Sequence, residues 1–223
     1  MTKELFFQAI SKFIFGLILA ALLLFLPAGT FRYWNGWLLI VILFVPMFCA
    51  GIVMMLRNPE LLKKRLNAKE SETEQKIVII LSGIMFLAAF VIVGLNHRFG
   101  WIVMPRWTAL AAAGVFLAAY LMYAEVLREN AYLSRTVEVQ EHQRVIDTGL
   151  YGIVRHPMYS ATVFLFLSMG FVLGSPISFL ILLCYLPIIA KRIKNEEEVL
   201  LQGLEGYQAY REKVRYKVIP FIW

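Results

Sequence analysis

The segment MYSATVFLFLSMGFVLGSPISFLILLCYLPIIA, residues 158–190, runs for 33 residues without a charged side chain. About 20 residues of helix cross the hydrocarbon core of a bilayer, so this segment is too long for one crossing. The run is interrupted by Gly174-Ser175-Pro176, and serine at an N-cap with proline after it is a helix-start signal. We therefore expect two short helices, Met158–Leu173 and Pro176–Arg192, folded as a hairpin that either crosses a thin bilayer or re-enters.

Four more apolar stretches of spanning length precede this hairpin: Ile10–Pro27, Trp37–Leu56, Ile77–Leu95 and Ala109–Leu127. Hydrophobic residues make up 60% of the chain and charged residues 17%, whereas soluble domains are about 45–50% apolar and 25% charged. The sequence predicts an all-α integral membrane protein with five to six transmembrane helices. We expect residues 1–128 to form a four-span part and residues 129–223 to form a second part that contains the hairpin.

The basic residues predict the orientation of these spans. If every segment crosses, 19 of the 22 Lys and Arg residues lie on the side of the N-terminus, and only Arg32, Arg98 and Arg106 lie on the other. Positive charge concentrates on the cytoplasmic side, so both termini are expected there. The net charge of +7 then needs no nucleic-acid partner, and some of these residues are expected to contact anionic lipid.

Two polar segments, residues 128–159 and 191–223, bracket the hairpin and are expected to meet on the cytoplasmic side. In the first, Gly149 permits a turn, and Arg155 and His156 stand where a helix begins at Pro157. The N–H groups of a helix start and an arginine fork suit a carboxylate ligand. The alternative is a basic, aromatic membrane anchor without a ligand.

In the second polar segment, Arg192 and Glu196 are four residues apart and share a helix face, while Glu197 points about 100° away. Consecutive glutamates beside a membrane suit a cationic ligand or hydroxyl and amine donors. The alternative is a solvated helix face with salt bridges. The apolar residues 218–223 are expected to dock on the membrane or to cover the site, and the histidines and cysteines predict no metal site.

These two segments together carry a family pattern. The first contains Thr148-Gly149-Leu150-Tyr151 followed by Arg155-His156-Pro157-Met158-Tyr159. The second contains Arg192-Ile193-Lys194-Asn195-Glu196-Glu197, then Gly206-Tyr207-Gln208-Ala209-Tyr210 and Ile219-Pro220. In this order and spacing, the motifs resemble the isoprenylcysteine carboxyl methyltransferase family and its phospholipid methyltransferase relatives, over about residues 130–221.

The resemblance implies a cytoplasmic S-adenosylmethionine pocket, built from the segment before the hairpin and the helix after it. Most of its cofactor-binding residues follow from the motifs, and Gln143 stands where many members have histidine. The set is Gln143, Gly149, Leu150, Tyr151, Val154, His156, Pro157, Tyr159, Glu196 and Glu197. By the same resemblance, Arg155, Arg192 and Glu197 are the expected catalytic residues, with an arginine holding the acceptor.

The expected reaction is methyl transfer to a lipophilic or prenylated acceptor that enters from the bilayer. The favoured acceptor is the carboxylate of an isoprenylcysteine-like substrate. One alternative is the amine of a phospholipid, which requires a base such as Glu197. Another is an NADPH-dependent sterol reductase, whose tail is similar. A transporter is disfavoured because the four upstream spans hold almost no ionisable residue. The sequence carries no signal of oligomeric state.

Overall fold

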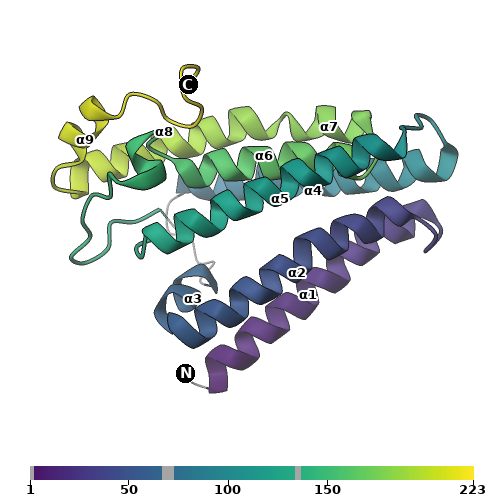
Figure 1. Cartoon of the computed structure of the whole chain (residues 1–223), viewed down its shortest axis with the longest axis horizontal. Helices are drawn as coiled ribbons and strands as arrows, with labels where there is room; N and C mark the ends of the chain where they lie inside the picture. The colour runs from purple at the N-terminus through teal and green to yellow at the C-terminus, as the bar shows by residue number, and fades with distance from the viewer. Residues whose placement is uncertain (1–2, 67–72, 134–136) are drawn as a thin grey trace.

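The computed structural model describes residues 3–66, 73–133 and 137–223, and within these ranges every regular element is a helix. The predicted all-α class is confirmed. The elements, shown in Figure 1, are α1 Lys3–Ala28, α2 Trp34–Arg57, α3 Pro59–Leu66, α4 Thr73–Phe99, α5 Arg106–Glu129, the short 3-10 turn η1 Gly149–Gly152, α6 Pro157–Val172, α7 Pro176–Leu182, α8 Tyr185–Gly203 and α9 Tyr207–Lys213.

Five segments of the described chain are long and apolar enough to cross a membrane. Four of them coincide with the predicted upstream spans, and the fifth covers α7 and α8 together, Pro176–Gly203. Helix α6 is shorter. The hairpin turn is built as expected: the Ser175 hydroxyl accepts a hydrogen bond from the Ser178 N–H at 3.2 Å, and Gly174 has a φ of +73°.

The second arm of the hairpin differs from the prediction in two ways. It is broken between α7 and α8, where Leu183 and Cys184 close a turn. Its helix also runs past Arg192, the expected end of the arm, to Gly203, so the arm and the helix face expected for Arg192 and Glu196 belong to one helix. The apolar run ends near residue 190, but the charged residues that follow are good helix formers, so the helix leaves the apolar zone without ending.

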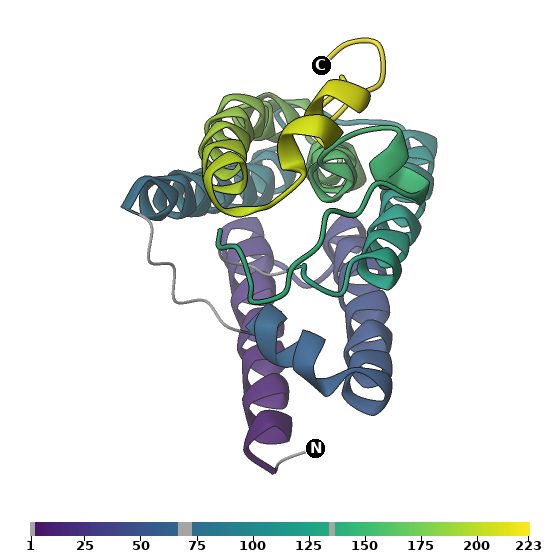
Figure 2. The same cartoon turned by 90° about the vertical axis from the view of Figure 1, so that its left-hand side faces the viewer.

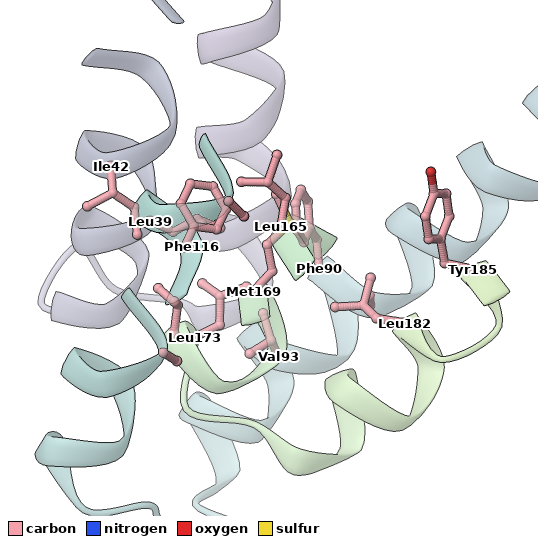
Figure 3. Packing of buried hydrophobic residues seen from close by; sticks show 14 of the residues in the cluster. Leu39, Ile42, Phe90, Val93, Phe116, Leu165, Met169, Leu173, Leu182 and Tyr185 are labelled. Carbon is pink, nitrogen blue, oxygen red and sulfur yellow. The ribbon is translucent and has the colours of Figure 1, made fainter. Parts of the chain in front are cut away.

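The helices pack as two groups (Figures 1 and 2). Helices α1 and α2 form one antiparallel pair, and α4 to α8 form the other group, in which α5 lies along α6 and α4 packs against α7 and α8. Helix α1 joins the groups by packing on α4. Figure 3 shows part of the shared core, in which Leu39 of α2, Phe116 of α5, Met169 of α6 and Leu182 of α7 are buried.

Large apolar side chains also cover the outside of the long helices. Phe15, Ile84, Leu110 and Leu121, from α1, α4 and α5, are all more than half exposed. Exposed apolar surface on this scale marks a face that meets something other than water. On helices of spanning length, the apolar solvent that fits is lipid.

The short connections after α1, α4 and α6 meet at one end of the molecule. The Tyr33 hydroxyl donates to the carbonyl of Leu173 at 2.5 Å, and its ring stacks on His97 with centroids 4.3 Å apart. The Asn35 side chain donates to the carbonyl of Val172 at 2.7 Å. Arg32, Arg98 and Arg106 lie in or beside these connections, so the three belong to one end of the molecule, as the charge count assumed.

The opposite end holds α3, residues 137–152, α9 and the chain after it, and it faces the viewer in Figure 2. Helix α3 is short and amphipathic, with Leu61 and Leu62 buried and Lys63, Lys64 and Arg65 in its last turn. Lys12 of α1 donates to the carbonyl of Leu66 at 2.5 Å, and Lys64 donates to Gln140 at 2.6 Å. Helix α3 therefore links the α1–α2 pair to the polar segment before the hairpin.

Candidate active site

The start of α6 is fastened by an extended stretch of chain, residues 214–218, which we call the strap. The backbone N–H groups of Arg155 and His156 donate to strap carbonyls at 2.9 and 2.8 Å, and the Ser160 hydroxyl donates to another at 2.5 Å. Arg155 Nη1 donates to two more, at 2.7 and 2.8 Å. The carbonyls used are those of Val214, Arg215, Tyr216, Lys217 and Val218. The polar groups that begin the helix are thus satisfied by the chain itself.

A buried carboxylate, Glu197, holds three basic groups beside the strap. Its oxygens lie 2.8 Å from Arg155 Nε, 3.2 Å from His156 Nε2 and 3.1 Å from Lys217 Nζ. Only 4% of Glu197 is exposed, and a charge so deeply buried is stable only when it is paired and hydrogen-bonded. The cluster joins α6, α8 and the strap into one rigid unit.

The neighbouring Glu196 lies 3.9 Å from His156 Nδ1 and also contacts residues that Glu197 does not reach. The Tyr159 hydroxyl donates to Glu196 Oε2, and Arg192 Nε donates to the Tyr159 hydroxyl at 2.9 Å. Tyr159 lies on α6 and the other two residues lie on α8. These three side chains form a polar row at the point where both helices leave the apolar part of the molecule.

A cavity lies between this polar row and the segment before the hairpin. Its walls come from residues 130–133 and 137–146, η1, the start of α6, α8 and α9. The lining residues are Asn130, Tyr132, Leu133, Val137, Glu138, Gln143, Arg144, Val145, Ile146, Tyr151, Arg155, His156, Met158, Tyr159, Arg192, Glu196, Leu200, Leu204, Tyr207 and Tyr210.

The cavity has an apolar part and a polar part. Leu204, Tyr207 and Tyr210 belong to a small hydrophobic cluster, against which Val145 and Leu200 pack. The polar row of Tyr159, Arg192 and Glu196 supplies the other part. An elongated ligand with a flat apolar group and a charged group matches this division.

Tyr207 has a buried hydroxyl with no hydrogen-bond partner in the described part of the chain. Its side chain lines the cavity and is 4% exposed. Burial raises the pKa of its phenol, and the charges of Glu197 and Glu196 raise it further, so the group is a neutral donor. A buried hydroxyl without a partner is costly, and a bound ligand would satisfy it.

Gly149, which the resemblance gave to the cofactor, has a structural reason to be glycine. Its φ is +50°, and a Cβ atom there would lie 1.8 Å from Glu129 Oε1. The same carboxylate accepts a hydrogen bond from the Leu150 N–H at 3.2 Å. Glu129 at the end of α5 therefore caps the η1 turn, and no other residue fits beside it.

The structure brings most of the predicted site residues to the cavity wall: Gln143, Tyr151, Arg155, His156, Tyr159, Arg192 and Glu196. The other five are not among the lining residues: Gly149, Leu150, Val154, Pro157 and Glu197. Leu150 and Val154 face a second, apolar cavity with Phe164 and Ile219, and Pro157 forms the first turn of α6. The binding and catalytic roles of all twelve stay predictions.

The strap takes up two of the backbone N–H groups beside the start of α6. The N–H groups of Arg155 and His156 both donate to strap carbonyls, so neither is open to an anion. The sequence could not show this, because the strap is about 60 residues further along the chain. In addition, Arg155 Nε and Nη1 are engaged by Glu197 and the strap.

Much of the cavity wall was missed by the sequence reasoning. Tyr207 and Tyr210 are three residues apart and share a face of α9, so the quoted Gly-Tyr-x-x-Tyr motif held a usable signal. Residues 137–146 have no regular structure and no hydrophobic period, so nothing in the sequence indicated that Glu138 and Arg144 line the cavity.

The sequence model of the isoprenylcysteine carboxyl methyltransferase family matches residues 107–202, from the start of α5 nearly to the end of α8. Among solved structures, the chain aligns with the eukaryotic intramembrane Ras methyltransferase, isoprenylcysteine carboxyl methyltransferase. The alignment covers 98% of this chain and 85% of that one, at 16% identity and a TM-score of 0.49. No curated protein matches the chain. The match over residues 107–202 agrees with the family resemblance that the motifs predicted over about residues 130–221.

Proposed function

We propose that this protein is a membrane methyltransferase that uses S-adenosylmethionine and methylates the carboxylate of an isoprenylcysteine-like acceptor. The observation that carries the proposal is the two-part cavity, most of whose lining residues belong to the region matched by the family, with Leu204, Tyr207 and Tyr210 just beyond it. One part is apolar, and the other contains a carboxylate and an arginine beside the apolar helices.

The residues present fit the cofactor. Val145, Leu200 and Leu204 offer an apolar slot for a nucleobase, and Glu196 offers a negative charge for a cationic group. The unpartnered Tyr207 hydroxyl supplies a donor inside the same wall. When bound, S-adenosylmethionine supplies a methyl group on a positively charged sulfur.

The protein's own task is to align the acceptor and to keep the site dry. Arg192 is held by Tyr159 at the membrane end of the cavity, where its guanidinium can bind a carboxylate in a fixed orientation. Binding two reactants in the correct alignment lowers the activation barrier, because their translational and rotational freedom has already been lost before the reaction step. The strap and the Glu197 cluster act indirectly: they hold the start of α6 in place, and this in turn positions Tyr159.

The acceptor is the finer part of the proposal. An amine acceptor needs a base to remove its proton. Glu197, the base expected for that case, contacts Arg155, His156 and Lys217 and does not line the cavity. Arg192 in the polar row instead favours an acceptor with a negative charge.

We also propose that the cavity end of the molecule is cytoplasmic. The charge count places 19 of 22 basic residues at that end, and the observed connections agree with the crossing pattern that the count assumed. The acceptor's lipid part would then reach the cavity sideways from the bilayer.

The test is calorimetric binding of S-adenosylhomocysteine to the detergent-purified protein, with NADPH measured in parallel. Saturable binding of S-adenosylhomocysteine supports the proposal, and binding of NADPH alone overturns it in favour of a reductase. The acceptor is tested by methyl transfer to a farnesylated cysteine with a free carboxylate, to its carboxamide and to phosphatidylethanolamine. Turnover of only the first supports the carboxylate assignment, and turnover of only the phospholipid overturns it.

A further inference from the structure

Helix α4 places the side chain of Gln75 against the polar row, in contact with Arg192. Gln75 is completely buried, although it stands near the start of a helix of spanning length. It lies outside residues 107–202, and neither the sequence motifs nor the family match assigns it a role. A buried side-chain amide needs hydrogen-bond partners, and both groups of this amide find them on one residue.

That residue is Arg192. Gln75 Oε1 accepts a hydrogen bond from Arg192 Nη1 at 3.2 Å, and Gln75 Nε2 lies 3.4 Å from the Arg192 carbonyl, to which it donates. On its other side, Arg192 Nε donates to Tyr159 at 2.9 Å. The guanidinium is therefore held from α4 and from α6 at once, while Arg192 itself belongs to α8.

We infer that Gln75 is a positioning residue that orients the Arg192 guanidinium toward the acceptor carboxylate, an inference that rests on the proposed function. A free arginine side chain has many rotamers, and one that must present a planar fork to a carboxylate gains from being fixed beforehand. Glutamine suits this task because its oxygen accepts from the guanidinium while its nitrogen donates to the backbone of the same residue. A leucine of similar size fills the space but orients nothing.

The inference also explains how the N-terminal part reaches the site. Among the residues that line the cavity, none comes from α1, α2 or α4. The Gln75–Arg192 pair is thus a direct hydrogen-bonded link from those helices to the polar row. The expected consequence is an effect on acceptor binding that does not pass through the nucleoside part of the cavity.

The experiment measures acceptor and cofactor parameters of Gln75→Leu in the detergent-purified, full-length protein. With a farnesylated cysteine as the acceptor, we expect its KM to rise about tenfold, the size typical of a lost hydrogen bond to a charged group. S-adenosylhomocysteine affinity should stay within about twofold, because its apolar slot and Tyr207 are untouched. Gln75→Glu keeps an oxygen that accepts from Arg192, so its acceptor KM should lie much closer to that of the wild-type protein than to that of Gln75→Leu.

Asn96→Leu is the matched control. Asn96 is a buried amide at the other end of α4 and bonds to the N–H and carbonyl of Ile102, at 3.1 and 3.0 Å. Its loss should lower the unfolding temperature without changing the acceptor KM. In an Arg192→Ala background, Gln75→Leu should add no further change in KM, since the residue acts through Arg192.

The outcomes separate the two proposals. If the wild-type protein binds S-adenosylhomocysteine and turns over the acceptor, but Gln75→Leu leaves the acceptor KM unchanged, the positioning role is overturned and the proposed function stands. An equal KM rise in the Asn96 control would also overturn it, as a general effect of disturbing α4. If the wild-type protein binds no S-adenosylhomocysteine, the proposed function fails and the positioning role fails with it.

Discussion

Two tyrosines of α9 show how the same side chain can stabilise the fold or await a ligand. The Tyr210 hydroxyl donates to the carbonyl of Tyr151 at 2.8 Å, so its hydrogen bond is part of the folded protein. The Tyr207 hydroxyl is buried in the same cavity wall and has no partner among the described residues. Replacing either residue by phenylalanine removes one hydroxyl. For Tyr210 the loss affects the stability of the fold, and for Tyr207 it affects the binding of a ligand.

We predict that Tyr207→Phe weakens S-adenosylhomocysteine binding about three- to tenfold and leaves the unfolding temperature unchanged. The loss corresponds to roughly 1 kcal/mol, the usual worth of one hydrogen bond. Tyr210→Phe should lower the stability by about 1 kcal/mol instead. Calorimetry and thermal unfolding in the same detergent measure both; equal affinity in Tyr207→Phe would show that this hydroxyl has no ligand.

Glu197 gives a second prediction at this scale. Glu197→Leu leaves Arg155 and Lys217 as buried or half-buried cations without their carboxylate, which typically costs about 3–5 kcal/mol. Glu198, its exposed neighbour on α8, serves as the control, and Glu198→Leu should change the stability by less than about 1 kcal/mol. The measurement is thermal unfolding; a fully stable but inactive Glu197→Leu would instead favour the direct catalytic role implied by the family resemblance.

At the scale of elements, the η1 turn depends on a glycine that faces a carboxylate. We predict that Gly149→Ala destabilises the protein by about 1–3 kcal/mol, because the left-handed conformation is strained for alanine and Glu129 must move. Gly83→Ala in α4 should have no such cost, since its Cβ would meet nothing within 4 Å and alanine favours a helix. Urea or thermal unfolding compares the two; equal stabilities would contradict the capping role of Glu129.

Hydropathy and turn chemistry were enough to predict the helices of the membrane part. Each span has an uninterrupted apolar run, and Ser175 caps the second arm of the hairpin as expected. The break at Leu183 was not predictable, because it does not change the local composition sharply. The strap was also missed, since its pairing with Arg155 and His156 joins residues that are far apart in the sequence.

At the scale of the molecule, the two ends differ in charge, which predicts how the protein sits in a membrane. In a background of Cys49→Ala and Cys184→Ala, a membrane-impermeant thiol reagent should label Lys213→Cys from the cytoplasmic side and Arg32→Cys from the other. Both positions are exposed, so access to each depends only on the side of the membrane. Labelling in right-side-out and inverted vesicles gives the answer, and the reverse pattern would contradict the proposed orientation.

The same scale explains why the site was only half predictable. Its polar residues, such as Tyr159, Arg192 and Glu196, follow from motifs on two neighbouring helices. Its remaining wall comes from an irregular segment and from α9, and Gln75 reaches it from a helix outside the recognised region. Contacts between such distant segments arise from the packing of the whole bundle, which no local pattern encodes.

The strap follows every membrane helix in the order of the chain, and this has a consequence for biogenesis. A ribosome-bound intermediate whose helices have already entered the bilayer still lacks residues 214–218, so Arg155 and Glu197 have not acquired all of their partners. The cluster around Glu197 is therefore completed only after the helices described here have been synthesised. A shorter nascent chain holds these helices without the contacts that fasten the start of α6.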